Sequence, residues 1–138
     1  MTGETNLRTL LRNMRPALHG EAFGFFSLAE EVALPLLPGA QGSFREEEGL
    51  TLILPLATAL AQGLQAEPPW ALITLTVHSS LEAVGFLAAI SAALAAAGIS
   101  LNAVSAYHHD HLFVPWGRRL EALAILERLA GDQPSGTP

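Results

Sequence analysis

Apolar positions in the first half of the chain switch between helical and strand spacing. Apolar side chains recur with the spacing of a short amphipathic helix at Leu7, Leu10, Leu11 and Met14,. Pro16 ends this pattern,. The run AFGFFSL over 22–28 predicts a strand, and SFREEEGLTLIL over 43–54 predicts a hairpin that turns at 48–49,. Pro55 can occupy the first position of a short helix over 55–60,.

The second half begins with a strand and a helix. ALITLTVH, over 71–78, is rich in β-forming residues,. Ser79 and Glu82 have the spacing of a capping box at the start of a helix, and Gly98 supplies the left-handed residue that ends it,. The alternating run after Gly98 predicts a second strand over 99–107,.

The rest of the chain completes most of a known pattern. HLFVP over 111–115 predicts a third strand, 118–130 predicts a helix, and the tail 132–138 has nothing to bury and is expected to be disordered,. From residue 71 on, the order is strand, helix, strand, strand, helix, which gives five of the six elements of a βαββαβ ferredoxin-like unit. The strand at 22–28 is the nearest candidate to cover the open sheet position.

The predicted fold class is therefore α+β, with two interlocked halves, an antiparallel sheet and helices on one face. The predicted boundaries are an N-terminal half over 1–66, a C-terminal half over 67–131 and the tail.

Composition excludes several classes of protein. The formal net charge is −6, and all seven basic residues are arginines, so the charge pattern of a nucleic-acid-binding protein is missing,. There is no cysteine for a disulfide or a thiolate zinc site,. The uncharged run over 83–104 is broken at Gly98, which argues against a membrane span,. The N-terminus lacks the pattern of a signal peptide, so the expected location is cytoplasmic.

Residues 105–115, SAYHHDHLFVP, place His108, His109, Asp110 and His111 side by side. Neighbouring residues of a strand point to opposite faces, but His109 and His111 could share a metal ion if His78 approached from the neighbouring strand. The alternatives are a polar hairpin turn that contacts a ligand in part, and a purely structural turn. We predict no bound metal and no cofactor, with a metal-dependent enzyme built on His78, His109, Asp110 and His111 as the rival hypothesis.

Two further polar stretches are candidates. In VHSSLEAVG, backbone amides at the start of a helix can bind a carboxylate and Ser79 and Ser80 add hydroxyls, although Ser79 can also act only as a cap,. In FREEEG, three carboxylates can bind an ammonium group or can hold Arg45 and solubilise a hairpin,. No nucleophile elbow, phosphate loop or dinucleotide fingerprint is present, so no catalysis is predicted,.

From Ala83 on, the helix predicted to start at Ser79 and end at Gly98 is apolar on nearly all sides. Ala83, Leu87, Ile90 and Leu94 form one stripe, while the opposite side is almost as apolar,. We therefore expect it to pack against the other half or another subunit, and the latter would make the protein a homo-oligomer, in the simplest case a dimer.

The stretches FREEEGLT, TVHSSLEAVG and HDHLFVP together resemble ACT domains, and over about residues 5–130 the chain resembles small bacterial stand-alone proteins with two ACT-like halves. The resemblance implies ferredoxin-like regulatory modules that bind amino acids or other small ligands, often at an interface and near the first strand-to-helix loop. GISLN matches the usual opening of the second strand. Many ACT domains have D-x-x-G in the loop, whereas here Ser and Glu precede Gly85.

The predicted function is a small-molecule sensor, most simply for an amino acid, that regulates a partner; a structural module without ligand is the third hypothesis. We expect the ligand's carboxylate at the backbone of 80–85 and its polar end near Asn102, with the histidine turn at the opposite end of the sheet and brought to the loop by another half or subunit. The predicted ligand-binding residues are His78, Ser79, Ser80, Leu81, Glu82, Val84, Gly85, Asn102, His109 and Asp110.

Overall fold

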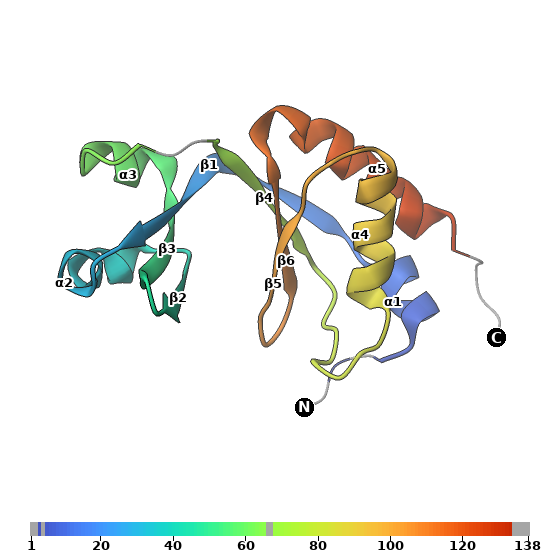
Figure 1. Cartoon of the computed structure of the whole chain (residues 1–138). Helices are drawn as coiled ribbons and strands as arrows, with labels where there is room; N and C mark the ends of the chain where they lie inside the picture. The colour runs from blue at the N-terminus through green and yellow to red at the C-terminus, as the bar shows by residue number, and fades with distance from the viewer. Residues whose placement is uncertain (1–2, 4, 66–67, 134–138) are drawn as a thin grey trace. The chain divides into compact units, whose positions relative to one another are not determined.

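The computed structural model describes residues 3, 5–65 and 68–133, and within them the chain forms two compact units (Figure 1). The larger unit contains the described residues up to His19 and from Ala71 onward. The smaller unit runs from Gly20 to Trp70. Strand β1, Pro16–Leu28, contributes its first residues to the larger unit and the remainder to the smaller one.

The larger unit has the predicted α+β, ferredoxin-like order of elements. It contains α1 (Leu7–Asn13), β4 (Trp70–Leu75), α4 (Phe86–Ala96), β5 (Asn102–Ser105), β6 (Asp110–Pro115), the 3-10 turn η2 (Trp116–Arg118) and α5 (Arg119–Gly131). Its strands lie in the order β1-β4-β6-β5. β5 and β6 form an antiparallel hairpin in which Asn102 pairs with Phe113 and Ser105 pairs with Asp110.

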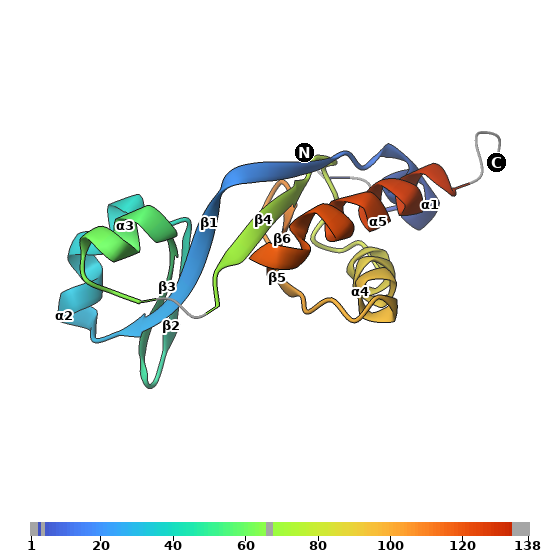
Figure 2. The same cartoon turned by 90° about the horizontal axis from the view of Figure 1, so that it is seen from above.

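One face of this sheet forms the core of the larger unit. Alternate residues of β4 are buried against the helices, because successive side chains of a strand point to opposite faces,. The apolar core comprises Leu10, Leu11, Met14, Ala71, Ile73, Leu75, Phe86, Ile90, Leu94, Ile99, Leu112, Val114, Ala122 and Leu126. Figures 1 and 2 show α1 and α4 beside α5. The prediction of helices on one face is confirmed for this unit.

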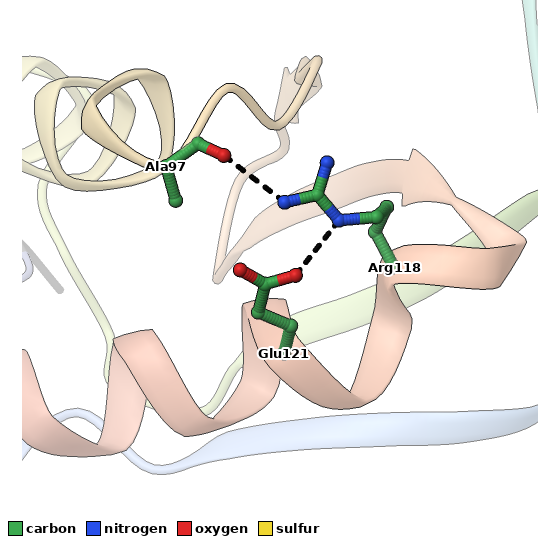
Figure 3. Close-up of polar contacts among 3 residues, drawn as sticks. All are labelled: Ala97, Arg118 and Glu121. Carbon is green, nitrogen blue, oxygen red and sulfur yellow. Dashed lines mark hydrogen bonds and ion pairs between the residues drawn. The ribbon is translucent and has the colours of Figure 1, made fainter.

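Arg118 links the end of α4 to the start of α5 (Figure 3). Its Nη2 donates to the carbonyl oxygen of Ala97 at 3.0 Å, and its Nε donates to Glu121 Oε1 at 2.8 Å. The last carbonyls of a helix lack partners within the helix, so a cation there is favourable. The hydrogen bond from Arg118 lowers the pKa of the Glu121 carboxyl below its ordinary value.

The smaller unit is built on a three-stranded antiparallel sheet. It contains α2 (Glu30–Ala33), the 3-10 helix η1 (Leu34–Gly39), β2 (Gly42–Glu46), β3 (Gly49–Pro55) and α3 (Leu56–Ala61). The strands lie in the order β2-β3-β1, and Phe23 to Leu28 pair with Pro55 to Leu50. The predicted hairpin is confirmed. Arg45 pairs with Glu30 at 2.6 Å and not with a carboxylate of the FREEEG run.

The open position beside β4 is covered by β1, but by residues that precede the predicted strand at 22–28. Arg15 accepts a hydrogen bond through its carbonyl oxygen from the amide of Thr76 at 3.1 Å. Residues 23–28, which the sequence placed there, pair with β3 instead. The strand starts at Pro16 rather than at residue 22, so its first residues belong to the larger unit and the remainder to the smaller one. The interlocked arrangement follows from this shared strand.

Several predicted boundaries differ from the observed ones. α4 begins at Phe86 rather than at Ser79, and β5 is shorter than the predicted 99–107. The predicted end at Gly98 is confirmed, since Gly98 has φ +71. The prediction for the tail, 132–138, falls mostly on 134–138, which lie outside the described residues. Among those described, no helix has the length and apolar character that crossing a membrane requires.

Candidate functional site

The segment between β4 and α4 is an extended loop, 76–85, rather than the first turns of a helix. Gly85 is the N-cap of α4, with φ +87, and no side chain caps the helix. The Ser79 hydroxyl donates to Asp110 Oδ2 at 2.9 Å. The Ser80 hydroxyl accepts from the amide of Glu82 at 3.0 Å. The predicted capping box is therefore wrong, because a contact distant in sequence takes the serine that would have capped the helix.

The 76–85 loop lies against the turn 106–109 between β5 and β6. In addition to the bond between Ser79 and Asp110, His109 Nδ1 lies 3.3 Å from the carbonyl oxygen of Val77. The rings of His78 and His108 have centroids 5.1 Å apart. The expectation that loop and turn occupy opposite ends of the sheet is wrong. A β-α-β crossover returns the second strand parallel to the first, so both strands end at the same edge.

Asn102 lies away from this site. It opens β5 and pairs with Phe113, whereas Ser105, at the other end of the strand, pairs with Asp110 beside the loop. Three residues of strand separate the two positions by about 10 Å. The prediction that Asn102 lies near the loop is contradicted by this register.

A cavity of about 190 Å³ opens between the loop, the turn and the start of α4. Its lining consists of Ser79, Ser80, Leu81, Ala83, Phe86, Leu87, Ser105, Ala106 and Asp110. Asp110 is 5% exposed, and its Oδ1 accepts from the Ser105 hydroxyl at 2.5 Å. The two serines therefore fix the carboxylate from either side, one from the loop and one from β5.

The structure brings together part of the predicted site. Ser79, Ser80, Leu81 and Asp110 line the cavity. The predicted residues that do not line it are His78, Glu82, Val84, Gly85, Asn102 and His109. Sequence reasoning missed Ala83, Phe86, Leu87, Ser105 and Ala106. The parallel direction of β4 and β5 could have identified Ser105 and Ala106 from the sequence, because it places the end of β5 beside the loop.

Charge in the cavity comes from Asp110 alone. The remaining lining residues are serines and apolar residues, and none of the seven arginines is among them. Buried carboxylates in proteins are usually paired with a cation or bound by several donors. Here the donors are two neutral hydroxyls, so the cavity presents a negative group to whatever enters it.

On the face of the sheet away from the cavity, His19 and His111 link three strands through Thr74. The Thr74 hydroxyl lies 2.9 Å from His19 Nε2 and 2.9 Å from His111 Nδ1. Burial lowers the pKa of His111 below its ordinary value, and the neighbouring His109 and His19 lower it further.

The four residues of the rival metal hypothesis are not brought together. Asp110 bonds to serines, His111 to Thr74 and His109 to Val77, while His78 faces His108. In the part of the chain that the structure describes, no group of three or more histidine, aspartate or glutamate side chains has an arrangement that could hold a metal ion.

A larger hollow, of about 530 Å³, lies between the end of α1 and the end of α5. Arg12, Arg15 and Glu127 line it, but no residue of the predicted site does. Arg15 already donates through Nη1 to the carbonyl oxygens of Arg12 and Met14. We therefore take the smaller cavity, with its buried carboxylate, as the candidate site.

Known protein families match the two halves of the sequence separately. Two family models described as ACT domain match residues 2–71 and 65–128. The chain belongs to the ACT-domain family. A search of curated proteins gave no match.

Solved structures similar to this ACT-domain chain include proteins of about the same length. A Vibrio cholerae protein of unknown function, described as a possible transport protein, is 40% identical with a TM-score of 0.79, over 90% of this chain and 95% of that one. An Agrobacterium tumefaciens protein is 18% identical with a TM-score of 0.69, over 85% and 89%. The regulatory subunit of aspartate kinase from Thermus flavus is 9% identical with a TM-score of 0.58, over 94% and 99%, and shares the fold.

Proposed function

We propose that this ACT-domain chain is a regulatory protein that binds an amino acid in the cavity between the 76–85 loop and the 106–109 turn, without catalysis of its own. The observation that carries the proposal is the buried Asp110 carboxylate, which faces a cavity whose other side is the start of α4. The cavity therefore has a negative group, the Asp110 carboxylate, on one side and the N-terminus of α4 on the other. An amino acid carries the complementary ammonium and carboxylate.

The ligand's carboxylate is expected one turn later than the sequence suggested. The amides of Glu82 and Ala83 already donate to the hydroxyl and carbonyl oxygens of Ser80. At the start of α4, by contrast, no side-chain hydrogen bond caps the helix, and Phe86 and Leu87 line the cavity. The first amides of a helix have no partner within it. They are therefore the donors that we assign to the ligand.

Membership of the ACT-domain family supports a regulatory role, and the similarity in fold to a regulatory subunit of aspartate kinase is consistent with it. The ligand would alter the chain's affinity for a partner in the cytoplasm.

The exposed side of α4 supports the further proposal of a homodimer. Ala88, Ala92 and Ala95 lie on that side and are exposed. In sedimentation at high concentration we expect a dimer, and Ala92→Glu should shift it to monomer by placing a charge in the contact. A wild-type chain that remains monomeric at high concentration would contradict the dimer.

Thermal-shift measurement with the twenty amino acids, nucleobases and divalent metal ions tests the proposed function. A ligand that binds the folded state raises the melting temperature by mass action. We expect a shift with at least one amino acid, and its loss in Asp110→Asn with the fold retained. A shift with metal ions alone would contradict the proposal and favour the metal-binding rival.

A further inference from the structure

The size of the cavity restricts what it can hold. Its volume is about 190 Å³. Pockets for drug-sized ligands begin at about 300 Å³. The ammonium, Cα and carboxylate of an amino acid would fill most of this cavity and leave room for only a short side chain.

The walls of the cavity restrict the chemistry of that side chain. Once Asp110 and the start of α4 hold the two charged groups, the remaining walls are apolar residues and serine hydroxyls. An acidic side chain would lie near the Asp110 carboxylate without a cation to pair with it. A lysine or arginine side chain would exceed the available space.

Leu87 is the wall residue that limits length. It is half-buried and packs against the apolar core of the larger unit, so its position is fixed from behind. Leu81, in contrast, is 65% exposed on the loop and can move aside. Leu87, rather than the exposed Leu81, therefore determines the longest side chain that can enter.

We infer that the site selects amino acids with short, uncharged side chains, namely glycine, alanine, serine and threonine, and that Leu87 sets the length limit. This inference rests on the proposed function, because it specifies the ligand of the same cavity.

Calorimetric titration of the full chain with single amino acids tests the inference. Glycine, alanine, serine and threonine form one group, and leucine, phenylalanine, aspartate and lysine form the other. A pocket that excludes a side chain by size typically discriminates by about tenfold to 200-fold, so we expect at least one member of the first group to bind about tenfold more tightly than every member of the second. Propionate, which is alanine without its ammonium, should not bind measurably.

Two variants locate the selectivity. Leu87→Ala should increase the affinity for leucine by about tenfold while that for the short amino acids changes little; unfolding cannot imitate this gain. Leu120→Ala is the matched control, since Leu120 is 65% exposed on α5 and does not line the cavity. Asp110→Asn should weaken binding of every amino acid by about tenfold or more through loss of a charge-assisted contact.

The outcomes separate the inference from the proposed function. If leucine, phenylalanine, aspartate or lysine binds the wild-type chain as tightly as the short amino acids, and Asp110→Asn weakens that binding, the selectivity is wrong and the proposed function stands. If Leu87→Ala leaves the preference unchanged, Leu87 does not set the limit. If no amino acid binds, both the inference and the proposed function fail.

Discussion

A single hydroxyl group, that of Thr74, lies between two imidazoles. His19 and His111 approach it from neighbouring strands at 2.9 Å each. One hydroxyl has a single proton to donate, so at most one of the two imidazoles accepts from Thr74, and any other donates to it. A proton added to the accepting ring removes its acceptor atom and places charge near His109 and His19. The folded state therefore favours neutral His111.

This arrangement predicts a loss of stability in mild acid. The pKa of His111 is lowered in the folded chain from an ordinary value of 6.5. Above that value both states are neutral; as the pH falls below it the unfolded chain takes up the proton first, and stability decreases until the lower folded-state pKa is passed. Thermal melts at about pH 7.5 and about pH 5 should show a smaller acid loss in His111→Asn than in wild type. The exposed His108, changed to Asn, should leave the loss unchanged, and an equal loss in His111→Asn would contradict the assignment.

At Gly85, the backbone conformation favours glycine over any other residue. Its φ of +87 is strained for any residue with a Cβ, whereas an added Cβ would meet only Leu7 Cδ2 at an ordinary 3.5 Å. Gly85→Ala should therefore cost about 1–2 kcal/mol of unfolding free energy through conformation alone. Gly117→Ala is the control, because Gly117 has open space and no positive φ. Equal stability of the two variants in urea would show that the loop relaxes.

At the scale of elements, α4 has one packed side and one side of exposed alanines. Ile90 is fully buried in the core, whereas Ala92 is exposed. Ile90→Ala should lower the unfolding free energy by about 2–5 kcal/mol, because it leaves a cavity. Ala92→Ser should change it by about 0.5 kcal/mol or less. Chemical denaturation of both variants measures the difference, and a small effect at Ile90 would mean that the core around the helix can collapse.

The elements themselves could largely be predicted from the sequence, because their signals are local. Hydrophobic spacing gave the helix at 7–14 and the hairpin at 43–54, and the left-handed Gly98 gave the end of α4. The start of α4 could not be predicted, since Ser79 forms its hydrogen bond with Asp110, 31 residues away. A capping motif in sequence cannot report a competing partner that only the fold supplies.

The candidate site was predicted in part for the same reason. Ser79, Ser80 and Asp110 were identified from polar stretches, which are visible in one dimension. Their correct grouping required the direction of β5 relative to β4. If β5 is taken to run antiparallel to β4, Asn102 is wrongly placed in the site and Ser105 is left out of it.

At the scale of the whole molecule, the larger unit is assembled from both ends of the sequence. Leu10 and Leu11 of α1, and Met14 directly after it, are buried in the same core as Ala122 and Leu126 of α5. A chain beginning at residue 67 would lack α1 and the first part of β1, exposing this core and one edge of β4. We expect it to aggregate or to melt without cooperativity, as followed by circular dichroism. A cooperative melt like that of the full chain would show that the C-terminal half folds alone.

The shared strand also bears on the order of events during synthesis. A ribosome releases the chain from its N-terminus, and compact units generally fold as they emerge. Residues 20–70 can complete their sheet once that stretch is free. The residues before them must wait, because α1 packs against α5, which is made after residues 20–70. The α1 segment therefore reaches its final place later than residues 20–70, which follow it in the sequence, and its apolar side chains stay exposed until α5 has been made.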